Sequence, residues 1–427
     1  MERRKVLITS SLCFKGEREP CRRKLIIPTK RSLISRAVFL LGATASLLSF
    51  AAPNADTANQ VVLEISATRE RPRNSEGAFW TTAAGRLEFY YSQFYGGEND
   101  FSASRIAEIH SDDQGRTWSA ATPVLENDPH NVNLMSVSVL RLASGKIAMF
   151  YILKRSEIDC RPYLRLSFDE GKSWSEAIVI NPAPGAYVEM ANDRVIQTWK
   201  GRIVVPLASY RVLKPVNDGF TAVDSRGIVI WYTSDDDGTN WIESPTWWTL
   251  PSLDSAGKLS VNGLEEPGVV ELADGSLFSW ARSDQGMQYG FRSMGGGNNG
   301  QQIFSAPEPT ELKSPFAPAN IKRVPNSATL LAVFDDHSGR FPFASDAGDN
   351  ISGRTPLVAA LSEDGGRTWP VRKILEGNVK GAFSYPSIYF VDGHTVLIAY
   401  NAEERYGMAS HLGSLRLRRI DLSWLRD

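Results

Sequence analysis

The chain has 427 residues, of which 42% are apolar and 22% are charged, the balance of an ordinary soluble globular protein. Its 47 basic and 48 acidic residues give a net charge of −1, and this excludes the basic excess that general binding to nucleic acid requires. Eleven Trp and 34 Gly indicate bulky residues used repeatedly and many tight turns, as in proteins built from short β-strands.

The N-terminal segment, residues 1–59, has the pattern of a basic leader followed by a secretory signal peptide. A basic stretch over residues 1–36 precedes an apolar run over residues 37–52, AVFLLGATASLLSFAA, and small residues follow it. The run is about as long as a signal-peptide core and too short for a comfortable membrane span. We therefore expect export to the periplasm, the cell surface or the medium, with no stable membrane span in the mature protein. An uncleaved membrane anchor is the alternative.

Residues 60–427 contain one motif four times, Ser-x-Asp-x-Gly-x-Thr-Trp, with Ser or Asn sometimes in place of Thr. Each copy suits a hairpin, because the Asp accepts hydrogen bonds from turn amides, the Gly allows a positive φ and the Trp packs under the turn. The copies are SDDQGRTW (111–118), SFDEGKSW (167–174), SDDDGTNW (234–241) and SEDGGRTW (362–369).

The intervals between copies set the number of units. The last interval, from Ser234 to Ser362, is about twice the earlier ones, which places a decayed copy within residues 291–309. At roughly 60 residues per unit the segment holds about six units, the last closed by a strand near Val61 beside one around residues 415–420. We therefore predict one all-β domain, a six-bladed β-propeller with four-stranded antiparallel blades, since radial blades protect their edges.

The four motifs resemble the Asp-boxes of sialidases and their relatives, and the likeness covers nearly all of residues 60–427. The resemblance implies a propeller of the sialidase type. The boxes alone do not specify the chemistry, since other propellers carry them. A sialidase binds the carboxylate of a keto-acid sugar through three Arg. It uses a Tyr activated by a Glu as nucleophile and an Asp as acid and base.

The strongest match to the family's catalytic residues is EPGVVELADGSLFSWARS. By resemblance, Glu266 activates the nucleophile and Arg282 binds the substrate carboxylate. Glu265 is the neighbouring candidate, and period-two alternation predicts that it points to the other face. The alternative is that Glu266 and Arg282 are only charged residues at solvated strand ends and have no catalytic role.

Two later segments match the family in the same way. Arg354, in GRTPLVAALSEDGGRTW, corresponds to a carboxylate-binding Arg just before the strand that enters the last box. Tyr385, in GAFSYPSIYFVDGHTVLIAYN, corresponds to the nucleophile and follows Arg354 by 31 residues. Here the chain has Tyr-Pro-Ser-Ile where the family often shows Tyr-Ser-x-Leu, so a Tyr that only packs a blade is the alternative.

The N-terminal match departs furthest from the family, which opens with Arg-Ile-Pro where this chain has RPRNSEG. Arg73 is the candidate for the first carboxylate-binding Arg, with Arg71 as runner-up. Asp100 is the candidate acid and base, with Glu98 as fallback. Glu76 is an acidic neighbour without an assigned role.

Asn192 and Arg194 open another strand pair and are candidates for contacts with the glycerol or N-acyl side of the sugar; turn residues between blades are the alternative. The five His are not spaced as metal ligands, and Cys160 is the one cysteine of the mature segment. No phosphate-binding Gly loop and no Gly-x-Ser-x-Gly elbow occurs. We therefore expect no cofactor and no metal.

The first hypothesis is an exported, sialidase-like glycoside hydrolase that acts on sialylated or other acidic glycans and not on nucleic acid, and we expect it to be a monomer. The altered N-terminal motif keeps two others open. One is a propeller glycosidase that acts on another sugar, and the other is a non-catalytic glycan-binding propeller.

Overall fold

The computed structural model describes residues 58–183, 185–213, 223–253, 257, 259–296, 300–342, 353–403 and 412–426. The basic leader and the apolar run lie outside these residues, so the signal peptide and export stay predictions. The described chain is nearly all β, with one short C-terminal helix, α1 (Leu422–Arg426). The prediction of an all-β protein is confirmed. None of the helices among these residues has the length and apolar character needed to cross a membrane.

Hydrogen bonding groups the strands into five sheets. The first contains β2 (Arg73–Thr81), β3 (Leu87–Phe94), β4 (Ser104–Ser111) and β5 (Thr122–Leu125). The second has nine strands: β6 (Asn133–Arg141), β7 (Ile147–Ser156), β8 (Asp159–Ser167), β9 (Ile178–Val179), β10 (Tyr187–Glu189), β11 (Ile196–Gln197), β12 (Ile203–Tyr210), β13 (Ile228–Ser234) and β14 (Ile242–Glu243). The third contains β15 (Leu264–Glu271), β16 (Leu277–Ser283), β17 (Met287–Gly296), β18 (Gln302–Phe304) and β19 (Glu308–Lys313). The fourth contains β20 (Asn320–Arg323), β21 (Leu330–Asp335), β22 (Leu357–Ser362) and β23 (Val371–Glu376). The fifth contains β24 (Ala382–Phe390), β25 (Thr395–Glu403), β26 (Leu415–Asp421) and β1 (Asn59–Ile65).

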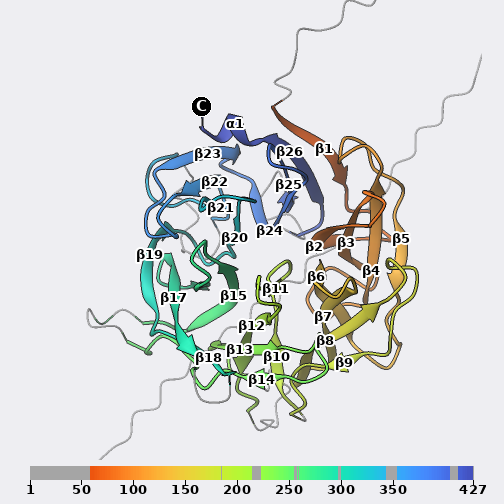
Figure 1. The fold of residues 1–427 in the computed structure, drawn as a ribbon, viewed down its shortest axis with the longest axis horizontal. Helices are drawn as coiled ribbons and strands as arrows, with labels where there is room; N and C mark the ends of the chain where they lie inside the picture. The colour runs from red at the N-terminus through yellow and green to blue at the C-terminus, as the bar shows by residue number, and fades with distance from the viewer. Residues whose placement is uncertain are drawn as a thin grey trace, which may run out of the picture. The chain divides into compact units, whose positions relative to one another are not determined.

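The sheets follow one another in chain order around a common centre, with β2, β6, β15, β20 and β24 on the inner side (Figure 1). The fifth sheet joins both ends of the described chain, because β1 pairs antiparallel with β26, with Val61 opposite Arg418 and Ile65 opposite Leu415. This confirms the predicted closure. Within the second sheet, β10 joins β8 through one parallel pair, Tyr187 opposite Cys160. The number of blades stays a prediction.

The four repeated motifs form the same hydrogen-bonded turn, each between the two outer strands of a unit. In the first copy Asp113 accepts bonds from the amide and the hydroxyl of Thr117, at 2.9 and 2.7 Å, and Ser111 Oγ accepts from Gly115 N at 2.8 Å. The Gly of each copy has a positive φ, between 80° and 86°. The turn explains the spacing, because every bond joins positions fixed within the motif. Residues 291–309, where a decayed copy was expected, contain the end of β17 and all of β18, which pair antiparallel.

Apolar clusters fill the spaces between successive sheets, and one lies within the nine-stranded sheet, between β6–β8 and β10–β13. Trp231, which is fully buried, shows how tight these interfaces are. Its ring stacks on Phe304 with centroids 4.1 Å apart, and its Nε1 donates to Ser279 Oγ at 3.0 Å. Burial of such a side chain contributes about 2–3 kcal/mol. Contacts of this kind hold neighbouring sheets together.

Candidate active site

Four inner strands share one irregularity close to their first residues. In β2, β6, β15 and β24 the pairing with the next strand shifts within the same short stretch. At each shift stands a residue other than Gly with a positive φ: Glu76 (57°), Ser136 (58°), Glu266 (46°) and Tyr385 (52°). A bulge bends the strand and redirects a side chain, and such backbone strain gathers at functional sites. All four side chains line one recess at the centre.

Small residues behind the bulges let the strands approach each other closely. A Cβ on Gly77 would lie 2.2 Å from the ring of Phe89, and one on Gly268 would lie 2.1 Å from the ring of Trp280. Both rings are fully buried. The aromatic side chain of the neighbouring strand therefore occupies the space beside each Gly, and only Gly fits there.

The structure brings the three predicted catalytic residues together, because Asp100, Glu266 and Tyr385 all line this recess. Their roles stay predictions. Tyr385 is half-buried, and burial together with the carboxylate of Glu266 raises its pKa, whereas Arg282 and Arg354 act in the opposite direction. Among the described contacts no hydrogen bond joins Glu266 to Tyr385. Catalytic hydrogen bonds are often long without substrate, so the geometry is compatible with proton transfer once substrate binds.

Arg73, the candidate first carboxylate-binding Arg, is almost fully buried at the start of β2. Its Nη2 lies 2.9 Å from Glu76 Oε1, and its Nη1 lies 2.6 Å from Asp100 Oδ1. Glu76 also accepts a bond from Ser136 Oγ at 2.8 Å. Burial raises the pKa of Glu76 to about 7, although Arg73 lowers it. Glu76, which had no assigned role, therefore fixes the orientation of Arg73.

Asp100 lies on the connection between β3 and β4, and its side chain is 57% exposed. Partial loss of hydration raises its pKa, but the charges of Arg73 and Lys154 outweigh this and bring the pKa to about 2. Its backbone carbonyl accepts a bond from the Nδ2 of Asn133 at 2.7 Å. As long as Arg73 holds it, Asp100 is ionised and accepts protons but cannot donate one.

The expectation for Glu265 is wrong. Strand alternation predicts that Glu265 and Glu266 point to opposite faces, yet both carboxylates contact Arg282, at 2.6 and 2.9 Å. The bulge breaks the alternation, because the pairing of β15 with β16 shifts between Glu265 and Gly268. Burial raises the pKa of Glu265 to about 7, and Arg282 opposes this. Arg282 also lies over the ring of Phe316, 4.2 Å from its centroid.

Arg354, the third candidate Arg, lies over the ring of Tyr385, 5.7 Å from the centroid. Its Nη1 is buried and has no hydrogen-bond partner within the described chain. Arg73 and Arg282 also interact electrostatically with the Tyr385 hydroxyl. The three predicted arginines thus surround one Tyr, and Arg354 offers an unused donor.

Asn192 and Arg194 lie beneath this site, and both side chains are fully buried. The amide of Asn192 donates to the carbonyls of Gly77 at 2.9 Å and of Tyr385 at 3.4 Å, so it ties two bulged strands together. Burial lowers the pKa of Arg194 to about 10, and its guanidinium lies 5.9 Å from the ring of Trp280. These positions suit support of the site, and direct contact of either residue with a sugar stays a prediction.

Sequence reasoning missed two charged members of the recess, Lys154 on β7 and Glu189 on β10. Lys154 Nζ lies 3.2 Å from Glu189 Oε1 and 4.9 Å from the centroid of Phe101. Burial lowers the pKa of Lys154, but Glu189 raises it well above its usual range. Lys154 ends an apolar run of a second strand, and a charge at that position was the signal that could have identified it.

The chain was compared with protein families, curated proteins and solved structures. The model of the BNR repeat-like domain matches residues 132–398, well over half of the chain. The Hadza microbial sialidase Hz136 is 18% identical, with a TM-score of 0.62 over 83% of this chain and 67% of its own. The NanB sialidase from Streptococcus pneumoniae is 13% identical, with a TM-score of 0.61 over 86% and 70% of the two chains. A leech intramolecular trans-sialidase is 14% identical, with a TM-score of 0.62 over 86% and 71%. No curated protein sequence matches significantly. At these identities the structural likeness shows the fold.

Proposed function

The chain belongs to the family of BNR repeat-like domains, within the sialidase superfamily, and from this premise we propose that it is a retaining exo-glycosidase of the sialidase type. It would release a terminal sialic acid or a related keto-acid sugar from a glycoconjugate. One observation carries the proposal: a Tyr lines a recess with Asp100 and Glu266, and three arginines lie around it.

Arg73, Arg282 and Arg354 would bind the substrate carboxylate. Charge-assisted bonds from a guanidinium to a carboxylate are short and directional, and their strength increases where water is excluded. The free Nη1 of Arg354 supplies one donor without breaking any bond. Arg73 is oriented by a carboxylate on its own strand, and Arg282 by one on the neighbouring strand, so little rotamer freedom remains to be lost on binding.

Tyr385 would attack the anomeric carbon while Glu266 accepts its phenolic proton. A neutral hydroxyl approaches a sugar acid without the repulsion that a carboxylate nucleophile would meet, and ionisation during attack supplies the nucleophile. The bond from carbon to the leaving oxygen breaks as the bond to Tyr385 forms. Water then attacks the covalent intermediate, and the proton returns from Glu266 to Tyr385.

Asp100 would protonate the leaving oxygen and later accept a proton from the attacking water. In the free protein it is ionised because Arg73 holds it at 2.6 Å. A substrate carboxylate that takes the same Nη1 of Arg73 displaces Asp100 and removes the main interaction that lowers its pKa. Substrate binding would therefore prepare Asp100 for protonation.

The proposal includes six blades. The nine-stranded sheet is held together at one parallel pair, Tyr187 opposite Cys160, and an apolar cluster separates β6–β8 from β10–β13. Division at this point gives a four-stranded unit, β6–β9, and a following unit, β10–β14. With the other four sheets these make six.

We further propose that residues 1–59 direct export, since substrates that carry terminal sugars lie outside the cytoplasm. The motivation is the basic stretch, apolar run and small-residue exit of the sequence. Comparison of the N-terminus of the protein recovered from the periplasm or medium with the encoded Met1 tests this proposal. An intact leader on protein confined to the cytoplasm would contradict it.

A second candidate is a glycosidase of the same mechanism that acts on a different acidic sugar. Lys154 and Glu189 favour it, because they place a partly buried ion pair in the recess, where a substrate group must match it. A substrate with a hydroxyl or a charge at that position would fit, and one with an apolar acyl group would not.

Hydrolysis of 4-methylumbelliferyl sialic acid by the full chain tests the proposal. Tyr385→Phe should reduce turnover by at least about a thousandfold, because it removes the nucleophile. Tyr389→Phe is the matched control, since it removes a hydroxyl four residues along the same strand, at the other end from the recess. Release of another sugar acid alone would favour the second candidate. Binding of glycans without turnover would favour a non-catalytic propeller.

A further inference from the structure

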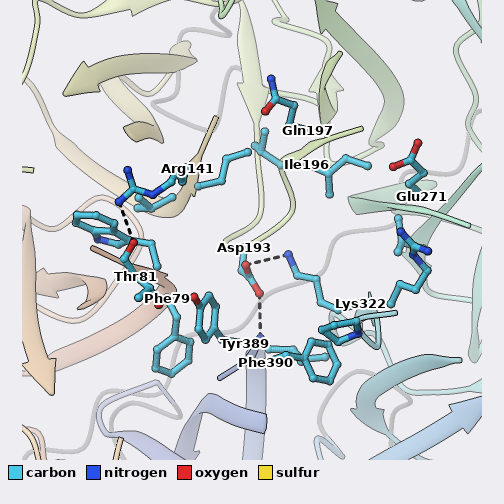
Figure 2. Close-up of a pocket in the computed structure, with 18 of the residues that line it drawn as sticks. Phe79, Thr81, Arg141, Asp193, Ile196, Gln197, Glu271, Lys322, Tyr389 and Phe390 are labelled. Carbon is cyan, nitrogen blue, oxygen red and sulfur yellow. Dashed lines mark hydrogen bonds and ion pairs between the residues drawn. The ribbon is translucent and has the colours of Figure 1, made fainter. Parts of the chain in front are cut away.

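A cavity of about 640 Å³ is shown in Figure 2. It lies at the opposite ends of the inner strands from the recess of Tyr385. Its lining comes from the last residues of these strands, among them Thr81 of β2, Glu271 of β15 and Tyr389 of β24. Because a strand rises about 3.3 Å per residue, four or five residues place this cavity roughly 15 Å from the recess. The volume lies within the range of pockets that bind small molecules. It is therefore a separate candidate site.

One wall of the cavity is aromatic. Phe79, Tyr389 and Phe390 lie along the lower side of the view in Figure 2, and Gln197 and Glu271 lie along its upper side. The hydroxyls of Tyr389 and Thr81 are hydrogen-bonded to each other, which fixes the ring of Tyr389. A flat apolar wall opposite polar groups suits a ligand with one apolar ring face and polar substituents.

Two of the charged side chains in the lining are already engaged. Asp193 accepts bonds from the Nδ2 of Asn320 at 2.8 Å and the amide of Ile388 at 2.9 Å, and its Oδ1 lies 3.0 Å from the Nζ of Lys322. Arg141 forms a bidentate ion pair with Glu170, with Nη1 2.7 Å from Oε1 and Nη2 2.6 Å from Oε2. Asp193 and Arg141 therefore stabilise the walls of the cavity.

The remaining charges are available to a ligand. Arg323 is half-exposed in the lining, and within the described residues no hydrogen bond or ion pair engages its guanidinium. The neighbouring ammonium of Lys322 uses one contact, to Asp193, and keeps protons to donate. Glu271 accepts one bond, from the amide of Trp199 at 2.9 Å, through Oε2. The other oxygen of Glu271 can accept a bond from a ligand hydroxyl.

From this lining we propose that the cavity is a second, non-catalytic binding site for a small sugar acid. Arg323 and Lys322 would bind the carboxylate, Glu271 would accept a bond from a ring hydroxyl, and the ring face would lie on Tyr389 and Phe390. Two adjacent cationic donors select an anion, and the acceptor near Arg323 selects a hydroxylated one over an aromatic acid. The inference depends on the lining of the cavity and is independent of the proposed hydrolysis.

Calorimetric titration of the full chain with galacturonic acid tests the site, with galactose and benzoate as comparison ligands. We expect galacturonic acid to bind and the other two to bind at least tenfold more weakly, since one lacks the carboxylate and the other the hydroxyls. Arg323→Gln should weaken binding of galacturonic acid at least tenfold. Arg69→Gln, in an exposed loop, is the matched control and should leave the affinity unchanged.

Arg354→Gln separates this site from the recess. The proposal would be overturned if Arg354→Gln lost galacturonic acid binding while Arg323→Gln kept it, because the ligand would then occupy the recess. Equal affinity for benzoate or galactose would overturn the ligand class. Hydrolysis of 4-methylumbelliferyl sialic acid should be unchanged by Arg323→Gln, and absence of that activity in the wild type would leave the binding result intact.

Discussion

Substitution of Gly268 by Ala tests whether close packing behind the bulge determines the position of Glu266. A Cβ at this position would lie 2.1, 2.5 and 2.7 Å from three ring atoms of Trp280. Trp280 is 1% exposed, and its Nε1 donates to the carbonyl of Ala319 at 2.9 Å. The ring therefore has no free space into which it could withdraw.

The size of the effect follows from these distances. Carbon atoms in contact lie about 3.5–4.0 Å apart, so the ring and the strand must separate by roughly 1.5 Å. Overpacking of this kind costs about 1–3 kcal/mol, and loss of the Trp280 hydrogen bond adds about 1 kcal/mol. For a domain of this length, we expect Gly268→Ala to lower the Tm by roughly 3–5 °C. Turnover should fall as well, because Glu266 is two residues away on the strand that must move.

Thermal unfolding of the full chain measures this cost. Gly393→Ala is the matched control, since its Cβ would have no atom within 4 Å, and we expect its Tm within about 1 °C of the wild type. In a Trp280→Phe background the added methyl should cost less, because the six-membered ring of the indole is gone. A Tm for Gly268→Ala equal to that of Gly393→Ala would refute the reasoning.

Two further predictions concern the surroundings of Arg73 and Asp100. Burial raises the pKa of Glu76 to about 7, so the folded protein binds a proton there that the unfolded chain releases above about 4.5. The stabilising contribution of this proton is complete below pH 4.5 and is lost as the pH rises through 7. The free energy of unfolding of Glu76→Gln, measured with urea, should therefore rise relative to that of the wild type between pH 5 and pH 8, by at most about 3 kcal/mol. If the free energies of unfolding of Glu76→Gln and the wild type differed by the same amount at pH 5 and at pH 8, the prediction would be contradicted. Asn133→Ala removes the donor to the carbonyl of Asp100 and should lower kcat about tenfold with little change in KM, and a change in KM alone would contradict the positioning role.

The repeated turns and the closure of the ring could be predicted because each depends on residues close in the sequence or on simple counting. The side chain of Asp113 accepts bonds from Ser111 and Thr117, Ser111 Oγ accepts one from Gly115, and all of these residues lie within the same motif. Counting the units predicted that the strand near Val61 pairs with the C-terminal strand and completes the last unit. Local hydrogen bonding and repeat length determine these features, and both are visible in the sequence.

The bulges could not be predicted from the sequence, because their cause lies in neighbouring strands. Glu266 is redirected where β15 shifts its register against β16, and the ring of Trp280, twelve residues further along the chain than Gly268, fills the space beside that Gly. Alternation therefore gave the wrong direction for Glu265. Lys154 lines the recess from the second strand of a unit. The charge that ends its apolar run marks the residue in the sequence, but the groups that it contacts depend on three-dimensional packing.

The central claim is that Tyr385 forms a covalent bond with the sugar. Mass spectrometry of the full chain after reaction with a 3-fluoro sialosyl fluoride tests it most directly, because the fluorine slows hydrolysis of the intermediate more than its formation. The account predicts an added sugar on the peptide that contains Tyr385 in the wild type and none on that peptide in Tyr385→Phe. A sugar attached to Asp100 or Glu266, or steady hydrolysis of unsubstituted substrate with no adduct on Tyr385, would contradict it.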